Sequence, residues 1–527
     1  MKSIVRHLSL AFILLFPVAT AFWVDRSEMS FLWWFMPGAV GLSLILFGFW
    51  YLTFGQADRR TRWHRVLVTA VGLLLVGILL FRIVRYEGSG SGSSYPVFSW
   101  AWQTRPEPVA QPAGPTADST APAVALTSDA IADVPDFLGP GRDGMWPAPS
   151  FGTDWTARPP QLLWRRPIGK GWSSFTVAGG RAFTQEQIGD DEHVTCLDPA
   201  TGAVLWTHSD PRTRLLLERG ENGGAAMGGD GPRATPVIHG DRVYTMGSTG
   251  IIHCLDRETG RVIWTRHLLR ELGGIAHRWG MANSPLVLTD PPLVVVAGPD
   301  QPGPTLIACD PETGETRWTY KGGGASYSSP RLLTLGGVPQ IVSVNYTDVS
   351  GLDPATGRAL WTHPWPLQFP KVGQPLLLPD DRLLVTASYG AGSLLLAVKH
   401  DPAGAFTTGL LWKTTYLKTK FSSAAVLGDH AYGLDEGRLA CIRLSDGKRV
   451  WKNEKFGFGQ HLLFGDTLLV QIETGDVVVG KLSPERFTET GRIPALTSMT
   501  WNTPAVAGRL LLVRNDREAS AWLLPPP

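Results

Sequence analysis

The amino-acid sequence predicts an all-β fold, an eight-bladed β-propeller of four-stranded antiparallel blades, preceded by N-terminal transmembrane helices. Three observations carry this prediction. The 527-residue chain opens with three apolar stretches, a pattern of Asp, Gly and Trp recurs beyond residue 133, and the counts of Gly (59), Pro (41) and Trp (21) are high. Turn-forming residues that recur with a large aromatic indicate many short strands joined by tight turns.

The chain is expected to have three parts, a membrane anchor at 1–86, a linker at 87–132 and the propeller at 133–527. The linker is rich in Gly, Ser, Pro, Ala and Thr and carries few charges. Because this composition cannot bury a core, we expect a flexible tether.

The anchor contains three predicted transmembrane helices, at 8–24, 31–54 and 66–84. A helix needs about 17–25 apolar residues to cross a bilayer, so the second and third stretches qualify clearly and the first marginally. An alternative remains open, because Ala19-Thr20-Ala21 resembles a signal-peptidase site. Cleavage there would leave two spans and the same exported C-terminus.

Basic residues predict the orientation of the anchor. Lys2 and Arg6 precede the first apolar stretch. Four more crowd the predicted loop between the second and third stretches: Arg59, Arg60, Arg62 and Arg65. Since cytoplasmic loops carry the excess of Lys and Arg, we expect the chain after Val84 to lie outside the cytoplasm. The expected location is the bacterial cytoplasmic (inner) membrane, with the propeller on the periplasmic, extracytoplasmic side.

One unit of the pattern Asp-x-x-Thr-Gly-x-x-x-Trp returns along the propeller region, for example from Asp198 to Trp206 and from Asp256 to Trp264. The short Asp side chain accepts hydrogen bonds from the turn that it opens. Gly supplies the positive φ of a tight hairpin. The Trp that ends the second strand is large enough to pack onto a neighbouring unit. With the hairpin that precedes each unit, the pattern predicts a four-stranded blade.

The number of blades follows from the tryptophans that close the fourth strands. These predicted docking residues are Trp164, Trp206, Trp264, Trp318, Trp361, Trp412 and Trp451, with an equivalent that lacks Trp near Thr490-Gly491. The seven intervals between them predict seven blades. The eighth combines the strands from Trp501 to Leu524 with a fourth strand at Gln161–Arg165, and this closure removes the exposed sheet edge.

The repeated unit resembles the tryptophan-docking motif of PQQ-type (pyrroloquinoline-quinone) eight-bladed propellers. The lead-in Phe137–Gly144, followed by Leu163-Trp164 and by Phe- or Tyr-Ser-Ser segments, resembles membrane-anchored bacterial PQQ-like repeat proteins. The resemblance covers about Asp133 to Pro527. It implies the fold, but that superfamily contains both quinoprotein dehydrogenases and the propeller lipoprotein of the outer-membrane β-barrel assembly machinery, a scaffold without a cofactor.

A quinoprotein dehydrogenase would bind PQQ with calcium, which carboxylate and amide oxygens hold. The metal candidates lie in the glycine-rich insertion that precedes the second blade: Glu218, Glu221, Asn222 and Asp230. Insertions between blades often line a propeller's mouth, although a solvated surface loop is the alternative interpretation.

A second group of residues lies near the starts of the inner strands, where they would line the channel mouth. These candidates are Arg233, His277, Arg278, Trp279, Tyr327, Ser328, Ser329, Lys420 and Trp501. Polar groups and aromatics around an axial funnel suit an anionic or planar ligand. Alternatively, the same residues satisfy strand ends and fill the channel. No catalytic residue is assigned, since the spacing offers His277 no Asp or Ser partner.

Other classes of function are not supported. The balance of 48 Lys and Arg against 46 Asp and Glu provides no basic field for nucleic acid. The four cysteines, Cys196, Cys254, Cys309 and Cys441, form no Cys-x-x-Cys pair and are expected as buried small residues in separate sheet cores. We therefore expect a non-enzymatic binding or scaffold module that contacts an envelope protein, a peptide or a glycan. The alternative is a PQQ-dependent membrane dehydrogenase that passes electrons to quinone.

Overall fold

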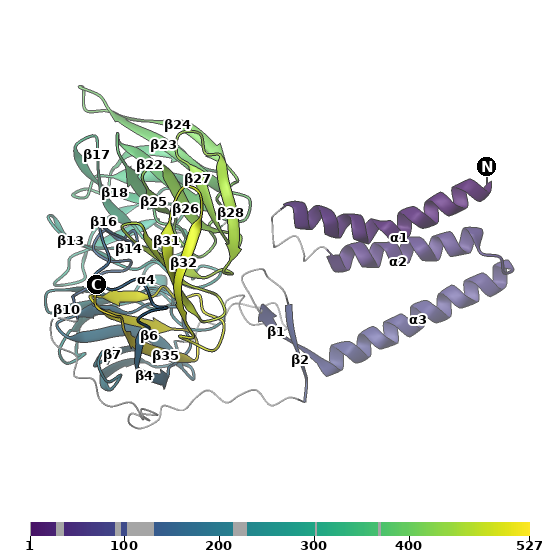
Figure 1. Cartoon of the computed structure of the whole chain (residues 1–527), viewed down its shortest axis with the longest axis horizontal. Helices are drawn as coiled ribbons and strands as arrows, with labels where there is room; N and C mark the ends of the chain where they lie inside the picture. The colour runs from purple at the N-terminus through teal and green to yellow at the C-terminus, as the bar shows by residue number, and fades with distance from the viewer. Residues whose placement is uncertain are drawn as a thin grey trace. The chain divides into compact units, whose positions relative to one another are not determined.

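A computed structural model describes residues 2–27, 36–89, 96–102, 131–213, 229–300, 303–366 and 370–527. The chain forms two compact units, an N-terminal one that ends at Pro106 and the propeller (Figure 1). The N-terminal unit begins with three helices, α1 (Lys2–Ser27), α2 (Met36–Phe54) and α3 (Arg59–Ile83). Each is long and apolar enough to cross a membrane, over Ile4–Trp23, Met36–Phe54 and Arg59–Leu79.

The four arginines expected in a loop lie instead on the first turns of α3. Asp58 causes this difference, because its Oδ2 accepts a hydrogen bond from the backbone N–H of Thr61 at 3.0 Å. A side-chain oxygen that caps an N-terminal N–H allows the helix to begin early. The basic cluster therefore marks one end of α3.

A short hairpin follows α3, within and just before the segment predicted as a flexible linker. β1 (Val84–Ser89) pairs with β2 (Pro96–Trp100) in antiparallel fashion. The aromatic and β-branched residues there, such as Tyr86, Val97 and Phe98, favour strands. Of the predicted linker, 90–95 and 103–130 lie outside the described residues.

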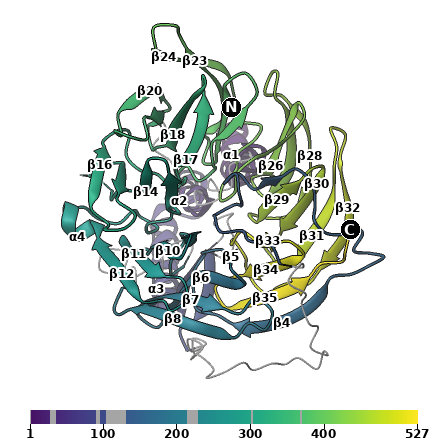
Figure 2. The same cartoon turned by 90° about the vertical axis from the view of Figure 1, so that its left-hand side faces the viewer.

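The propeller has eight sheets arranged around a central axis, as predicted (Figure 2). Blades 1 to 4 have the following strands, from the axis outward: β5 (Thr176–Ala178), β6 (Arg181–Ile188), β7 (Asp191–Leu197) and β8 (Val204–Asp210); β9 (Val237–His239), β10 (Arg242–Met246), β11 (Ile251–Asp256) and β12 (Val262–His267); β13 (Leu286–Thr289), β14 (Pro292–Ala297), β15 (Leu306–Cys309) and β16 (Thr316–Tyr320); β17 (Arg331–Leu335), β18 (Val338–Val344), β19 (Asp348–Leu352) and β20 (Ala359–Pro364).

Blades 5 to 8 follow the same order: β21 (Leu376–Leu378), β22 (Arg382–Ala387), β23 (Gly392–His400) and β24 (Phe406–Thr414); β25 (Ala425–Leu427), β26 (His430–Asp435), β27 (Arg438–Arg443) and β28 (Arg449–Lys455); β29 (Gln460–Phe464), β30 (Thr467–Gln471), β31 (Val477–Leu482) and β32 (Phe487–Ile493); β33 (Ala505–Ala507), β34 (Leu510–Arg514), β35 (Glu518–Leu523) and β4 (Gln161–Pro167). The short helix α4 (Leu268–Leu272) lies between blades 2 and 3. As predicted, β4 closes the ring by pairing with β35.

The lead-in before β4 crosses the inside of the ring, a feature that the sequence analysis did not predict. Its strand β3 (Met145–Trp146) pairs in parallel with the inner strand of blade 7, so this sheet has five strands. Arg142 donates to the Pro285 carbonyl of blade 3 at 2.9 Å, and Asp143 pairs with Arg331 of blade 4 at 3.0 Å. Blades 3 and 7 lie opposite each other in a ring of eight, so the segment 134–146 plugs the channel.

The fourth-strand tryptophans pack between neighbouring blades. In six of them the indole Nε1 donates to a backbone carbonyl in the following blade, at 2.7–3.0 Å: Trp164, Trp206, Trp264, Trp318, Trp412 and Trp451. The turn glycine allows this approach. A Cβ added to Gly260 would lie 2.5 Å from Trp206, and the residue has a φ of +70°.

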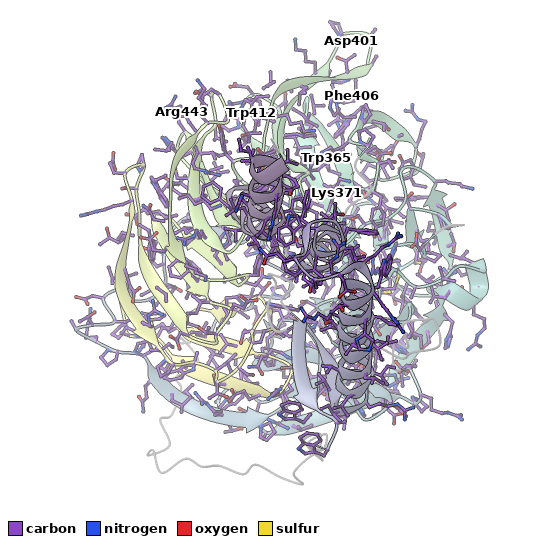
Figure 3. All side chains as sticks on the ribbon, turned by 90° about the vertical axis from the view of Figure 1, so that its right-hand side faces the viewer. Trp365, Lys371, Asp401, Phe406, Trp412 and Arg443 are labelled. Carbon is purple, nitrogen blue, oxygen red and sulfur yellow. The ribbon has the colours of Figure 1, made fainter. Side chains whose placement is uncertain are left out.

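Trp361 differs from the other predicted docking tryptophans, because its Nε1 donates to Oε1 of Gln340 within its own blade at 2.6 Å. The cause lies in blade 5, where β23 and β24 are nine residues long and no short turn reaches over Trp361. Asp401 and Phe406 lie at the end of this extended hairpin (Figure 3). In blade 7, Gly491 occupies the tryptophan position opposite Val479, and Trp155 of the lead-in packs against it.

All four cysteines are free and buried. One expectation about them was wrong, because Cys254 and Cys309 share a core cluster between blades 2 and 3. Cys254 pairs with the tryptophan position of its blade, whereas Cys309 lies one residue further along, opposite Thr316. A shift of one residue turns a side chain to the other face of its sheet, so the two residues face each other's blade.

Candidate functional site

The mouth of the propeller is formed where each chain segment enters an inner strand. At one equivalent position per blade the residues are Trp172, Arg233, Ala282, Tyr327, Val372, Phe421, Phe458 and Trp501, which we call the mouth ring. Two residues further on is a second layer of polar residues, which we call the girdle: Ser174, Thr235, Ser284, Ser329, Gln374, Ser423, Gln460 and Thr503. The two layers come from the same register position in all eight blades.

The girdle joins neighbouring blades by hydrogen bonds. The backbone N–H of Ser174 donates to Oγ1 of Thr235 at 3.0 Å, and that of Thr235 donates to Oγ of Ser284 at 2.9 Å. The N–H of Ser284 donates to Oγ of Ser329 at 2.9 Å. Buried backbone donors need such partners, since an unsatisfied N–H is costly. The girdle thus has a structural role beneath the mouth.

Two predicted mouth candidates therefore satisfy strand ends. Ser329 belongs to the girdle, and the hydroxyl of Ser328 donates to the Gly373 carbonyl at 3.0 Å. Both side chains are buried. The contacts of Ser328 and Ser329 therefore agree with the alternative interpretation, in which these residues satisfy strand ends.

Aromatic rings cover one arc of the mouth. The rings of Trp172 and Trp501 lie 4.9 Å apart, those of Trp501 and Phe421 4.8 Å, and those of Phe421 and Phe458 6.1 Å. The Trp501 indole also donates to Oε1 of Glu473 at 2.9 Å. Offset and tilted aromatic pairs at these separations are favourable, so the arc is a packed apolar cluster in which Phe458 and Trp501 are buried and Trp172 and Phe421 are partly exposed.

Lys420 is enclosed by this aromatic arc. Its Nζ lies 4.8 Å from the ring centroids of Tyr389 and Phe458. Burial lowers the pKa of Lys420, while Glu436 and Glu473 oppose that shift. A lysine over ring faces makes cation–π contacts that strengthen as water is removed.

The opposite arc contains the predicted cluster at 277–279. Arg278 is exposed and its guanidinium lies 5.2 Å from the Trp279 ring centroid. Trp279 and Tyr327 are 5.5 Å apart, and the Tyr327 hydroxyl accepts from the Trp279 N–H at 3.3 Å. Tyr346 lies 6.4 Å from Tyr327 in an edge-to-face arrangement. Aromatics and a cation therefore line this side as well.

His277 is buried below that arc. Its Nε2 lies 3.1 Å from the carbonyl oxygen of Gly298, so this nitrogen carries the proton and donates. Its Nδ1 has no hydrogen-bond partner among the described residues. Burial lowers the pKa of His277, which stays a neutral imidazole at neutral pH. Neither ring nitrogen forms a hydrogen bond to a described Asp or Ser side chain, as a general-base pair would require. The charge of nearby Asp300 opposes the lowering of the pKa of His277.

Arg233 turns back onto its own loop, donating to the carbonyls of Gly231 at 2.6 Å and Gly229 at 2.8 Å. Burial lowers its pKa to about 10, opposed by nearby Tyr327, Glu192 and Asp230. Asp230, the one described metal candidate, forms an ion pair with Lys170 at 3.0 Å. The other three candidates, Glu218, Glu221 and Asn222, lie outside the described residues.

Sequence reasoning missed several mouth residues. Trp172, Phe421 and Phe458 hold the same register position as Arg233 and Trp501, so an alignment of the repeats was the signal that reveals them. Lys371 was also missed. It lies 5.0 Å from the ring of Trp365, beside which Figure 3 shows it, and burial lowers its pKa to about 8.

A calcium–quinone centre would need its metal ligands at the mouth, and three of the four predicted ligands lie outside the described residues. Calcium requires several oxygen ligands, with carboxylates among them. Within the described ranges, three metal-ligating His, Cys, Asp or Glu side chains come together at one place, His208, Asp210 and His253, outside the mouth. The carboxylate of Glu473 accepts from Trp501, and that of Glu436 accepts from the Ser388 hydroxyl at 2.6 Å.

Comparisons with known proteins agree with the architecture. A family model described as outer membrane protein assembly factor BamB matches residues 190–453, half of the chain. The solved structure of quinohemoprotein alcohol dehydrogenase from Comamonas testosteroni is 12% identical, covers 76% of this chain and 82% of its own, and has a TM-score of 0.54. BamB from Moraxella catarrhalis is 16% identical, covers 69% of this chain and 98% of its own, and has a TM-score of 0.47. No curated protein sequence matches the chain. At 12% identity, the dehydrogenase structure shows a shared fold alone.

Proposed function

The chain belongs to the PQQ-type β-propeller family described as outer membrane protein assembly factor BamB, and from this premise we propose that it is a non-enzymatic binding or scaffold module of the cell envelope. In this proposal the three helices anchor it in the bacterial cytoplasmic membrane. The arginines at the start of α3 mark the cytoplasmic end of that helix, and the propeller lies on the periplasmic side.

The observation that carries the proposal is the surface chemistry of the mouth. Aromatic rings come from at least five blades, and Trp172, Phe421 and Trp279 among them are partly exposed. The rim cation Arg278 is exposed, whereas the other cation, Lys420, is buried among the rings. Such surfaces bind flat and anionic groups through stacking and charge.

We assign the occupant as a segment of an envelope protein with acidic and aromatic side chains. Arg278 provides an exposed charge at the rim, and the arc from Trp172 to Phe458 provides the apolar contact. Aromatic and arginine residues dominate the binding energy of many protein interfaces. The family's description as an assembly factor fits a protein partner in the envelope.

The test uses the full chain in its own membrane, with a photo-crosslinking amino acid placed at Phe421 in the mouth. The matched control places it at Val450, an exposed position on the outer strand of the same blade. A defined protein adduct is expected from Phe421 and none from Val450. Changing Arg278 to Gln, at the exposed rim charge, is expected to reduce the adduct several-fold. Equal adducts at both positions would argue against the mouth as the binding surface.

A second experiment separates this proposal from the dehydrogenase alternative. The full chain in detergent is titrated with PQQ, with and without calcium, and followed by calorimetry and visible absorbance. No binding is expected. Saturable, calcium-dependent binding near one equivalent would replace the scaffold proposal with a quinoprotein dehydrogenase.

A further inference from the structure

Three metal-ligating side chains gather between blades 1 and 2, away from the mouth ring. His208 and Asp210 are two residues apart on β8, so they face the same side of that strand. His253 comes from β11 of the neighbouring blade (Figure 2). One ligand atom from each side chain lies within 4.8 Å of the others.

The geometry of the cluster leaves one ligand atom unsatisfied. Nε2 of His253 lies 2.6 Å from Oδ2 of Asp210. Nε2 of His208 lies 3.5 Å from Oδ1 of the same carboxylate, is buried, and has no hydrogen-bond partner among the described residues. The two imidazole rings meet edge to face at 4.6 Å. A buried orphan nitrogen directed at a carboxylate is costly unless another group occupies the space.

Neighbouring groups hold the ligands in a metal-binding orientation. Nδ1 of His253 lies 2.8 Å from Oγ1 of Thr265, which directs Nε2 toward Asp210. Metal-ligating histidines commonly bond through their second ring nitrogen in this way. The nearby carboxyl of Glu192 is occupied by the hydroxyl and backbone N–H of Ser248. Glu192 therefore does not compete for the two imidazoles.

We propose that His208, Asp210 and His253 bind a divalent transition-metal cation of the zinc class, which bridges blades 1 and 2. Two imidazoles and one carboxylate are the donor set that such cations prefer, whereas calcium and magnesium prefer oxygen alone. Tetrahedral ligands about 2.0–2.1 Å from zinc are about 3.3 Å apart. The two distances are to different oxygens of Asp210, 3.5 Å from Oδ1 to His208 and 2.6 Å from Oδ2 to His253. One ligand atom from each residue lies within 4.8 Å of the others, so metal binding draws these atoms together. Solvent can supply the fourth ligand, since the Asp210 side chain is 21% exposed.

The test uses the full chain in detergent, purified with a tag that contains no histidine and stripped of metal with a chelator. Zn²⁺ is titrated by calorimetry, and Co²⁺ is titrated with its visible d–d absorption as the readout. One equivalent of each metal is expected to bind. His208→Gln, Asp210→Asn and His253→Gln are each expected to lower the zinc affinity by about 100-fold or more, and Thr265→Val by about 10-fold.

The matched control is His239→Gln, an exposed histidine on β9 of blade 2. It is expected to leave zinc binding unchanged. Wild-type affinity in the three ligand variants, or an equal loss in the control, would overturn the proposal.

A measurement on the unaltered chain covers the case in which the variants fail to fold. Histidines are carbethoxylated with and without Zn²⁺, and the modified sites are mapped by mass spectrometry. Zinc is expected to protect His208 and His253 and to leave His239 reactive. Equal modification of all three histidines in the presence of zinc would also overturn the proposal.

Discussion

His461 lies on β29, the inner strand of blade 7, and its side chain is buried. Its Nδ1 has no hydrogen-bond partner among the described residues. Burial lowers the pKa of His461 from 6.5 to about 4. The folded protein therefore keeps this imidazole neutral at a pH where the unfolded chain takes up a proton.

The contribution of His461 to the free energy of unfolding is expected to fall as the pH drops from about 6.5 to 4. In this range the unfolded state binds one more proton at His461 than the folded state, so acid favours unfolding. The loss of unfolding free energy from this group is at most about 3.5 kcal/mol, at about 1.4 kcal/mol per pH unit. His461→Gln is expected to flatten the slope of unfolding free energy against pH, measured by urea denaturation.

His239→Gln serves as the control and should leave that slope unchanged. Glu192 contributes with the opposite sign, because burial raises its pKa from 4.5 to about 7 and the folded state holds the extra proton between these values. This contribution is common to all the variants and cancels between them. A parallel slope in His461→Gln and the wild type would refute the assignment.

A buried carboxylate in blade 6 holds three cations. Asp435 is fully buried, and its oxygens lie 2.8 Å from Lys418 Nζ, 3.2 Å from Arg449 and 2.8 Å from Lys452 Nζ. Removing the negative charge would leave positive charges close together with little solvent. Such a loss costs more than the loss of a surface ion pair.

Asp435→Asn is expected to lower the free energy of unfolding by about 3–5 kcal/mol. The matched control is Asp446→Asn in the same blade, which removes a partly exposed pair with Arg443 and should cost about 0–1 kcal/mol. Chemical denaturation of both variants provides the comparison. If both variants lose a similarly small amount of unfolding free energy, the three cations around Asp435 are solvated.

The hairpin turn and the tryptophan that docks on it join successive blades. In blade 2, Oδ1 of Asp256 accepts from the Thr259 N–H at 2.9 Å, and the Gly260 N–H donates to the Asp256 carbonyl at 2.9 Å. Trp206 of blade 1 covers Gly260 and donates to the Arg257 carbonyl at 3.0 Å. The turn forms from neighbouring residues of blade 2, and its contact with Trp206 joins it to blade 1.

Trp264→Ala is expected to destabilise the propeller by about 3–5 kcal/mol, because Trp264 is buried and its loss leaves a cavity between blades. Trp206→Ala is expected to cost less, because Trp206 is partly buried. Thermal unfolding checks this expectation. Leu205→Ala, at an exposed position beside Trp206, should cost little. An unchanged unfolding temperature in both tryptophan variants would contradict the docking role.

The girdle is expected to contribute to the stability of the propeller, because it provides acceptors for buried backbone N–H groups. Ser284→Ala removes the acceptor of the Thr235 N–H and should cost about 1–3 kcal/mol, measured by denaturant unfolding. Ser483→Ala, on an exposed turn, is the control. A cost no larger than that of the control would mean that water replaces the lost acceptor.

The pairing of β4 with β35 joins the two ends of the propeller region and closes the ring. β4 starts at Gln161, and its partner β35 ends at Leu523. Without β35, β4 loses its pairing and blade 8 loses its connection to blade 1. The ring then has the exposed edges that closure removes.

Deleting Glu518–Pro527 is therefore expected to abolish cooperative unfolding and to cause aggregation, which calorimetry and light scattering would detect. Deleting Pro526–Pro527 alone removes two exposed residues and should change neither property. A truncated chain that still unfolds cooperatively at the wild-type temperature would show that closure is dispensable.

The number of blades and the closing strand could be predicted from the sequence because their signals are local. Asp, Gly and Trp lie within nine residues in the four complete units, and the turn that they form depends on bonds between near neighbours, such as Asp256 to Thr259. The three apolar helices were likewise predictable, since crossing a bilayer requires only length and composition.

Only the tertiary structure decided which of these units touch and what their contacts create. The change of acceptor at Trp361 depends on the length of a hairpin in the next blade, and the plug depends on where the lead-in enters the ring. His253 meets Asp210 across 43 residues of chain. No local pattern specifies such contacts, because they arise from the packing of separate sheets around one axis.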